Sequence, residues 1–275
     1  MLRWAFVTMA LLAACGAPQT GGPSALGGGP SVQAPPRLSG EVTVFAASSL
    51  TEVFTEIAHG FETVHPGVRV TLTFGGSPQL RTQIEHGARA DVFAAANVEQ
   101  MDLAVRNGVI AGTPRLFAGN RLVVVVAREN RGRVDTLADL ARPGLKVVLA
   151  QREVPVGAYA RDAIQQLAAE LGAGADYADR VLRNVVSEEP NVRHVLAKVQ
   201  LGEADAALVY LTDVTPATAS AVRQLLIPEV ANVVARYPIA RTAGSSNADA
   251  AEAFIAYVLS PAGQEILKRY GFLPP

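Results

Sequence analysis

Cysteine, charge and long apolar runs are all scarce in this chain of 275 residues. The single cysteine, Cys15, excludes an intramolecular disulfide framework and any zinc site built from several thiolates. Charged residues make up 18% of the chain and the net charge is -1, so nothing attracts it to nucleic acid. No apolar run reaches the roughly 20 residues of a membrane-spanning helix in a mature protein. Apolar residues, at 49%, suffice for one large or two ordinary domains.

The first residues have the pattern of an export signal. Arg3 supplies a positive charge, and the apolar run that follows has secretory-signal length, so we expect residues 1–14 to be a signal peptide. Leu12-Ala-Ala-Cys15 resembles a bacterial lipobox, in which the cysteine is acylated and becomes the new N-terminus. An ordinary signal peptide with a chance cysteine is the alternative. Residues 15–40 are rich in Gly and Pro, which predicts a lipidated Cys15 followed by a flexible tether.

From residue 41 onward, short apolar segments alternate with apolar residues at helical spacing. We expect strands at residues 42–46, 68–74, 91–95, 122–127, 146–150 and 206–210. We expect helices at residues 50–61, 78–87, 98–107, 159–171, 192–199, 247–259 and 261–270. This alternation is typical of an α/β fold with parallel strands.

Three turns where a strand passes into a helix are small and uncharged, at residues 47–49, 75–77 and 155–157. Ligands of open α/β sheets collect at the carboxyl ends of strands, where helix N-termini present free amides. Two of the turns add serine hydroxyls, which suits an anion. A serine before a helix is most often a plain N-cap, however, and Ser77 before Pro78 has the sequence of one.

Six short motifs follow one another along the folded part. They are Val44-Phe-Ala-Ala-Ser-Ser-Leu50, Phe74-Gly-Gly-Ser77, Ala90-Asp-Val-Phe93, Val154-Pro-Val-Gly157, Asn191-Val-Arg193 and Leu208-Val-Tyr210. In order and spacing they resemble those of the periplasmic molybdate-binding proteins, the solute receptors of ATP-driven (ABC) molybdate importers. The resemblance runs from about residue 41 to residue 272. It implies a two-lobed periplasmic-binding-protein fold, type II-like, in which each lobe is a mixed, mostly parallel sheet flanked by helices, with a hinge between them.

The resemblance also implies the lobes and the site. Residues 41–121 with 237–275 would form one lobe, and residues 122–236 the other. One molybdate or tungstate would bind in the cleft through Ser49, Ser77, the amides of Val156 and Val192, and the phenol of Tyr210. Ser48 is a possible additional donor. Molybdenum would be present only as molybdate, with no direct metal ligand and no cofactor.

The resemblance implies a receptor rather than an enzyme. Its partners would be an ABC permease with its ATPase and, through Cys15, the membrane; no nucleic acid is expected, and the protein would be a monomer. It would be exported and would lie at the outer face of the cytoplasmic membrane or in the periplasm.

The residue types support an oxyanion independently. Molybdate is fully deprotonated at neutral pH, so all its oxygens accept hydrogen bonds and a site made only of donors suits it. A phosphate that keeps a proton benefits from a carboxylate acceptor, and none of the five residues is acidic. Sulfate has the same charge, so its rejection would depend on cavity size.

Other interpretations of these residues remain open. The chain could be a receptor for another oxyanion such as sulfate. A serine hydrolase is less favoured, because Ser49 lies in Ala-Ser-Ser-Leu instead of Gly-x-Ser-x-Gly. No two of the four histidines are spaced i, i+4 for a metal. Tyr210 could be a plain core tyrosine, and Asp91 is expected to bond nearby backbone groups.

Overall fold

The computed structural model describes residues 38–275, which belong to one compact unit. The predicted signal peptide, the lipidated Cys15 and nearly all of the predicted tether lie outside the described residues. None of the helices in residues 38–275 has both the length and the apolar character that crossing a bilayer requires.

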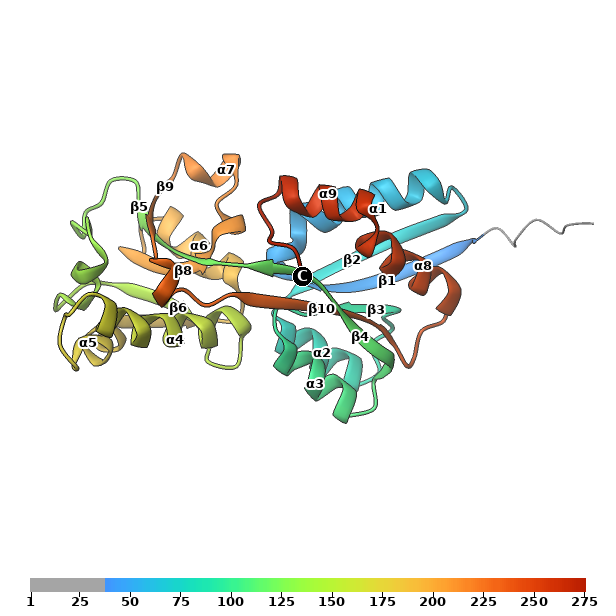
Figure 1. Ribbon diagram of the computed structural model, residues 1–275, viewed down its shortest axis with the longest axis horizontal. Helices are drawn as coiled ribbons and strands as arrows, with labels where there is room; N and C mark the ends of the chain where they lie inside the picture. The colour runs from blue at the N-terminus through green and yellow to red at the C-terminus, as the bar shows by residue number, and fades with distance from the viewer. Residues whose placement is uncertain (1–37) are drawn as a thin grey trace, which may run out of the picture. The chain divides into compact units, whose positions relative to one another are not determined.

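The first sheet has five strands in the order β2-β1-β3-β10-β4 (Figure 1). Their bounds are β1 Gly40–Ala47, β2 Val68–Gly75, β3 Val92–Ala94, β4 Ile110–Asn120 and β10 Ala235–Thr242. Five helices flank it: α1 Thr51–Val64, α2 Ser77–Glu85, α3 Val98–Arg106, α8 Ala248–Leu259 and α9 Pro261–Arg269. Helices α1, α8 and α9 cover one face, while α2 and α3 cover the other. We call this sheet and its helices the first lobe.

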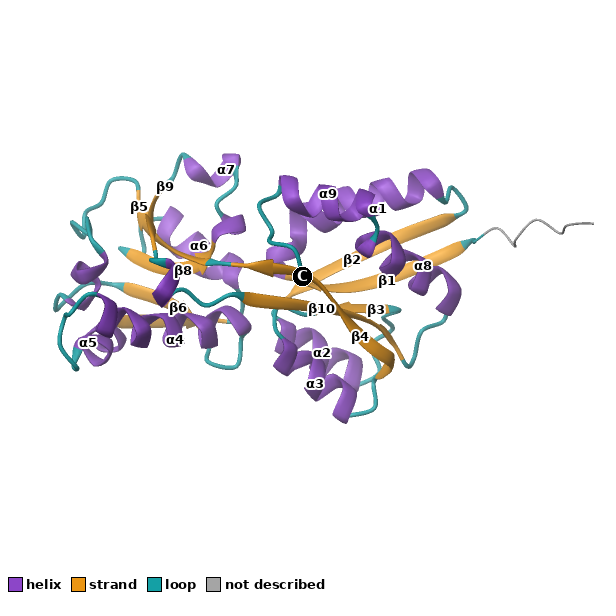
Figure 2. Cartoon of the chain, in the orientation of Figure 1, coloured by secondary structure: helices purple, strands orange, loops and turns teal. Residues whose placement is uncertain are grey.

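The second sheet also has five strands, in the order β7-β6-β8-β5-β9 (Figure 1). They are β5 Leu122–Ala127, β6 Val147–Ala150, β7 Val185–Glu189, β8 Ala206–Tyr210 and β9 Val222–Leu226. The helices are α4 Pro155–Glu170, α5 Tyr177–Arg183, α6 Val192–Gln200 and the short α7 Pro216–Ala219. We call this sheet and its helices the second lobe. Figure 2 shows the strands inside and the helices outside in both lobes.

Four single turns of 3-10 helix complete the described elements. They are η1 Ser48–Leu50, η2 Leu137–Ala141, η3 Leu211–Asp213 and η4 Glu229–Ala231. The first follows β1 directly and leads into α1, and the third follows β8. Both therefore lie at the carboxyl ends of strands.

Two mixed sheets flanked by helices confirm the expected two-lobed α/β fold. The strands are less parallel than expected, because each sheet has two parallel and two antiparallel pairings. The antiparallel pairings all involve β10 in the first sheet and β5 in the second. The chain passes between the sheets after β4 and again before β10, and these strands run against their neighbours. The division into lobes by residue number stays a prediction.

The start of α2 corrects one expectation. Ser77 is not the N-cap, because it is already in the helix and Gly76 is the capping residue. The Ser77 hydroxyl oxygen instead accepts a hydrogen bond from the Ala96 amide, at 3.1 Å. Helix α4 starts at Pro155, earlier than its apolar spacing predicts, since proline is well suited to the first position of a helix.

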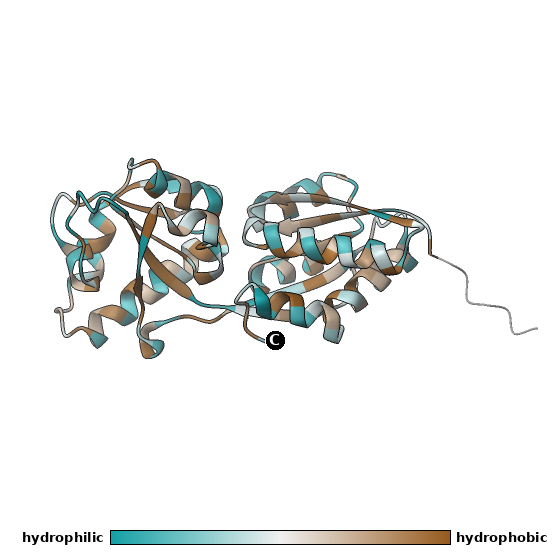
Figure 3. Ribbon diagram, turned by 90° about the horizontal axis from the view of Figure 1, so that it is seen from above, coloured by the Kyte–Doolittle hydropathy of each residue, from teal (hydrophilic) through white to brown (hydrophobic). Residues whose placement is uncertain are grey.

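Buried apolar residues form the core of both lobes. Figure 3 shows hydrophobic stretches of the chain in both of them. All six residues of β5 are buried, and four of them are valine, whose branched side chain favours strands. In the first lobe the rings of Phe61 and Phe254 meet edge to face, with centroids 5.4 Å apart. A smaller apolar cluster, including Leu80 and Met101, lies beneath α2 and α3.

Asp91 has the structural role that the sequence predicts. Its carboxylate accepts hydrogen bonds from the amides of Thr43, Ser246 and Asn247 and from the hydroxyl of Ser245. Burial by itself raises the pKa of Asp91, but these hydrogen bonds together outweigh it and leave the pKa below its ordinary value. The carboxylate therefore ties β1 to the loop before α8.

Candidate functional site

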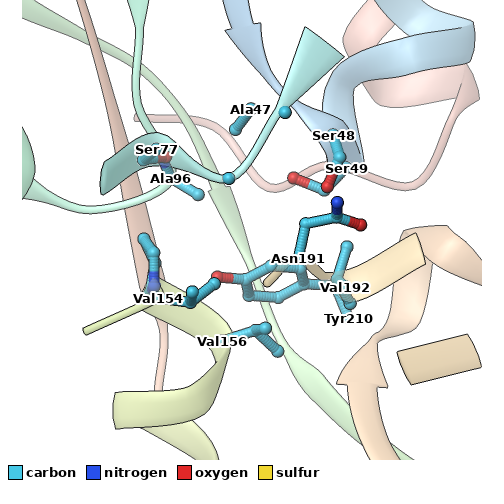
Figure 4. A pocket seen from close by; sticks show the side chains of 13 residues that line it. Ala47, Ser48, Ser49, Ser77, Ala96, Val154, Val156, Asn191, Val192 and Tyr210 are labelled. Carbon is cyan, nitrogen blue, oxygen red and sulfur yellow. The ribbon is translucent and has the colours of Figure 1, made fainter. Parts of the chain in front are cut away.

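A small pocket lies between the two lobes, at the ends of β1, β2 and β8. It is lined by Ala47, Ser48, Ser49, Gly75, Gly76, Ser77 and Ala96 of the first lobe and by Val154, Pro155, Val156, Asn191, Val192 and Tyr210 of the second (Figure 4). All these residues are uncharged. The structure thus brings together the five residues predicted to bind the oxyanion, and Ser48 with them. Whether they bind a ligand stays a prediction.

The pocket is compact. Its free volume is about 10 Å³, which is room for roughly one water molecule. An organic substrate therefore does not fit between the lobes in this state.

Helix N-termini surround the pocket. Ser49 lies in η1, Ser77 and Val192 are the first residues of α2 and α6, and Val156 is in the first turn of α4. Amides in the first turn of a helix have no carbonyl partner within the helix. The amides of Val156 and Val192 have no backbone acceptor elsewhere in the described part of the chain. These ends carry the positive pole of the helix dipole, which attracts anions.

Local sequence explains why the second-lobe helices begin here. Pro155 occupies the first position of α4. Asn191 is the N-cap of α6, and its side-chain oxygen accepts from the amides of Arg193 and His194, at 3.0 and 3.1 Å. The asparagine oxygen is thus occupied by the helix, and the amide of Val192 is left free for the pocket.

Glycine is required at two close backbone approaches beside the pocket, one between the lobes and one within the second lobe. A Cβ atom on Gly76 of the first lobe would collide with the carbonyl oxygen of Pro190 of the second. Gly157 is equally tight, because its Cβ would overlap the carbonyl oxygens of Ala150 and Gln151. Each glycine lets backbone approach backbone beside the pocket.

Tyr210 brings a buried side-chain donor to the pocket from the second lobe. Its ring extends from the end of β8 into the pocket and is 1% exposed (Figure 4). The hydroxyl is buried and has no hydrogen-bond partner within residues 38–275. A buried polar group without a partner costs about 1–3 kcal/mol. Burial raises the pKa of Tyr210 well above its ordinary value, so the hydroxyl keeps its proton and is ready to donate.

The first lobe contributes serine hydroxyls. The Ser77 oxygen accepts from the amide of Ala96, so its own hydrogen is available to the pocket. The Ser49 oxygen lies 3.1 Å from the hydroxyl oxygen of Tyr237. Ser48 uses its carbonyl oxygen, which accepts from the hydroxyl of Thr51 and from Nε of Arg193. The Ser48 hydroxyl forms no hydrogen bond within residues 38–275.

Arg193 connects the lobes beside the pocket. From α6 it donates to the carbonyl oxygen of Ser48, at 3.2 Å, and forms an ion pair with Glu52 of α1. Its Nε also lies 3.6 Å from Oδ1 of Asp213. Asp213 is fully buried, and burial raises its pKa to about 7 although the charge of Arg193 lowers it. The guanidinium is thus shared between acids of both lobes.

The pocket lacks the groups of a hydrolase or a metal centre. No histidine lines it, and the partner of Ser49 is a tyrosine. Within residues 38–275, no group of three His, Cys, Asp or Glu residues could hold a metal ion. The serine hydrolase interpretation of Ser49 therefore has no base in reach.

Some residues of the site were not predicted. Asn191 stands in a quoted motif, and its position before a helix was a usable signal for a cap. Gly76 and Ala96 line the pocket, and Gly76 was part of a turn already singled out. Tyr237 and Arg193 act across long sequence separations, which no local pattern reveals.

Comparisons with known proteins concern the chain as a whole. Residues 42–273 match the family model of bacterial extracellular solute-binding proteins. The chain is 42% identical over 234 residues to the molybdate-binding protein ModA of Mycobacterium tuberculosis, with 85% of each chain covered. It is 34% identical over 240 residues to ModA of Escherichia coli, with 85% of this chain and 89% of the relative covered. The solved periplasmic molybdate-binding protein of Azotobacter vinelandii shares the fold, with a TM-score of 0.71 at 20% identity and with 85% of this chain and 99% of that chain covered.

Proposed function

Because the chain belongs to the bacterial extracellular solute-binding protein family, we propose that it is a receptor for molybdate, and for its analogue tungstate. It captures the anion between its lobes and delivers it to the permease and ATPase of an ABC importer. It acts as a binding protein, without a chemical step. The observation that carries this proposal is a pocket lined only by uncharged residues, with helix N-termini and a partnerless phenol facing it. Relatives at 42% and 34% identity are named for molybdate.

The donors suit a fully deprotonated dianion. The hydroxyls of Ser49, Ser77 and Tyr210 and the amides of Val156 and Val192 each donate to one of its oxygens, and Ser48 is placed to add a sixth donor. The dipole of each helix end contributes about 0.3–2 kcal/mol toward the negative charge. No carboxylate faces the pocket to accept a proton from a protonated anion.

Ligand binding and lobe closure are coupled in this proposal. Two donors come from the first lobe and three from the second, so one anion bonded to all five holds the lobes together. A ligand that binds the closed state better shifts the population toward it. The closed form is then the one that the permease recognises.

The place of the receptor follows from the N-terminal pattern. The protein is exported, anchored by acyl chains on Cys15 and tethered by the Gly- and Pro-rich residues between Cys15 and β1, and it works as a monomer. Mass spectrometry of the mature protein tests the anchor. A diacylated Cys15 as the first residue is expected, and a mature chain that starts elsewhere without acyl chains contradicts it.

Calorimetric titration tests the ligand. The protein from residue 38 onward is freed of ligand and titrated with molybdate, tungstate, sulfate and phosphate. One-to-one binding of the first two, with sulfate and phosphate at least a hundredfold weaker, is the expected result. Tight binding of sulfate with no response to molybdate assigns the pocket to the alternative, a sulfate receptor.

A further inference from the structure

Tyr237 lies directly behind Ser49 and does not line the pocket. It belongs to β10, its ring is fully buried, and its hydroxyl forms hydrogen bonds with two polar groups. These are Oγ of Ser49, at 3.1 Å, and Nδ2 of Asn120, at 3.4 Å. Asn120 is the last residue of β4, so the contact joins three strand ends of the first lobe. The proposed binding of an oxyanion has given Tyr237 no role so far.

The orientation of the Asn120 amide is fixed by its other contacts. Its Oδ1 accepts from the backbone amide of Arg121, at 2.9 Å, and its Nδ2 donates to Oγ1 of Thr212, at 2.8 Å. Nδ2 therefore faces Tyr237, and an amide nitrogen only donates. The phenol oxygen of Tyr237 is the acceptor of this contact.

The direction of the next hydrogen bond follows. The hydrogen of the Tyr237 hydroxyl cannot go to Asn120, which already presents a hydrogen. Of the two groups with which this hydroxyl forms hydrogen bonds, only Oγ of Ser49 can accept. The ring of Tyr210 packs against that of Tyr237, with centroids 5.8 Å apart, but the Tyr210 hydroxyl forms no hydrogen bond within residues 38–275, so Ser49 is the acceptor. Burial raises the pKa of Tyr237 above its ordinary value, so the hydroxyl does not lose this hydrogen.

The hydroxyl hydrogen of Ser49 has only one direction in which it can form a hydrogen bond. Its oxygen receives a hydrogen from Tyr237 on the side away from the pocket. Apart from the Tyr237 oxygen, which here is the donor, the described part of the chain offers the Ser49 hydroxyl no acceptor. The hydrogen therefore points to the pocket, where an anion can accept it.

We propose that Tyr237, oriented by Asn120, is a positioning residue that fixes Ser49 as a hydrogen-bond donor and so favours unprotonated oxyanions. The inference rests on the proposed function, because it concerns the same pocket. A protonated anion such as hydrogen phosphate must donate one hydrogen bond. When the Tyr237 hydroxyl donates to Ser49, the Ser49 hydroxyl can only donate to the pocket, so it cannot accept a hydrogen bond from a protonated anion. Without the Tyr237 hydroxyl, Ser49 can rotate and accept it.

A double-mutant cycle tests the inference. Molybdate and phosphate affinities are measured by calorimetry for the wild type, Tyr237→Phe, Ser49→Ala and the double variant, each checked for folding by thermal unfolding. Tyr237→Phe is expected to bind molybdate about threefold to tenfold more weakly, the worth of one oriented hydrogen bond. The ratio of its molybdate affinity to its phosphate affinity is expected to fall by a larger factor than the molybdate affinity itself. In the double variant, loss of Tyr237 has no further effect, since Tyr237 acts only through Ser49.

Tyr177→Phe is the matched control. Tyr177 is also fully buried, and its hydroxyl donates to the carbonyl oxygen of Leu137, at 2.6 Å, away from the pocket. Tyr177→Phe also removes one buried hydrogen bond. It is expected to leave the molybdate affinity and the preference for molybdate over phosphate unchanged.

The outcomes separate the inference from the proposed function. Equal losses for Tyr237→Phe with and without Ser49, or an unchanged preference over phosphate, overturn the inference while molybdate binding stands. If the wild type binds sulfate and not molybdate, the proposed function fails, and the same cycle run with sulfate still tests the role of Tyr237. A wild type silent to all these anions overturns both.

Discussion

The two lobes supply the pocket with donors of different kinds. The first lobe offers the hydroxyls of Ser49 and Ser77, whereas the second offers the amides of Val156 and Val192 and one phenol. An amide in the first turn of a helix is aimed by the backbone itself. A serine hydroxyl rotates, and each one here is held by another group: Ser49 by Tyr237 and Ser77 by the amide of Ala96.

This difference shows where the specificity of the pocket can be changed by substitution. In the first lobe a single side chain removes a donor or changes its direction. In the second lobe the amides persist with any side chain except that of proline, so the position of the backbone that carries them matters most. Contacts between the lobes decide whether the two sets of donors meet at all.

The largest effect is expected where the lobes touch. Gly76→Ala places a Cβ against the carbonyl oxygen of Pro190, so the closed state is strained while the separated lobes are not. Overpacking costs about 1–3 kcal/mol, which predicts molybdate binding weaker by up to about a hundredfold. Calorimetry measures the affinity, and small-angle X-ray scattering with molybdate shows whether the lobes stay apart.

Gly244→Ala is the control for this prediction. A Cβ at Gly244 meets nothing within 4 Å, and its φ is not in the left-handed region. It is expected to bind like the wild type. If Gly76→Ala does so too, the lobes close differently from the arrangement described here.

Tyr210→Phe is expected to have the next largest effect. It removes the phenol donor of the second lobe and leaves the ring in place, so the fold and thermal stability are retained. A hydrogen bond to a charged partner contributes about 1.5–3 kcal/mol, which predicts affinity lower by about tenfold or more. Calorimetry with molybdate measures it, and an unchanged affinity removes Tyr210 from the site.

A smaller effect is expected from the ion pair between the lobes. Glu52→Gln removes the charge that Arg193 meets in the first lobe. Because both side chains are partly exposed, the pair is worth at most about 1 kcal/mol, so release of molybdate is expected to be about twofold to fivefold faster. Stopped-flow displacement by excess tungstate measures the release rate.

Glu56→Gln tests whether this effect depends on the contact between lobes. Glu56 lies one turn further along α1, and its partner Arg269 is in the first lobe. Its loss is expected to leave the release rate unchanged. If the two variants release molybdate equally fast, the faster release comes from the change in net charge and not from the loss of the contact between Glu52 and Arg193.

Local sequence patterns predicted most of the fold but not strands β4 and β10, at which the chain leaves the first lobe and re-enters it. The strands at residues 42–46 and 122–127 were predicted because both segments are short and almost entirely apolar. The strand β4 contains Gly112 and Pro114, and β10 contains Pro238 beside a register shift, so neither has the alternation that marks a strand. Their pairing comes from the tertiary structure, where they form the connection between the lobes.

The site was predictable to different depths. The composition of the turns pointed to Ser49, Ser77 and the turn with Val156, because a strand end followed by a helix is a local feature. Val192 and Tyr210 were assigned only through the resemblance. The contact of Tyr237 with Ser49 joins residues 188 positions apart, so only the folded arrangement reveals it.

The smallest effect should come from the second lobe's backbone donors, and it sharpens the contrast between the lobes. Val156→Ala shortens a buried side chain but leaves the amide at the start of α4, so molybdate affinity is expected to change less than twofold while thermal stability falls. Ser77→Ala has the opposite signature: affinity falls about tenfold, because a donor to the charged anion is lost. Calorimetry and thermal unfolding of both variants separate the two signatures. If Val156→Ala lost affinity as Ser77→Ala does, the pocket would depend on the valine side chain, and the division into hydroxyl and amide lobes would not hold.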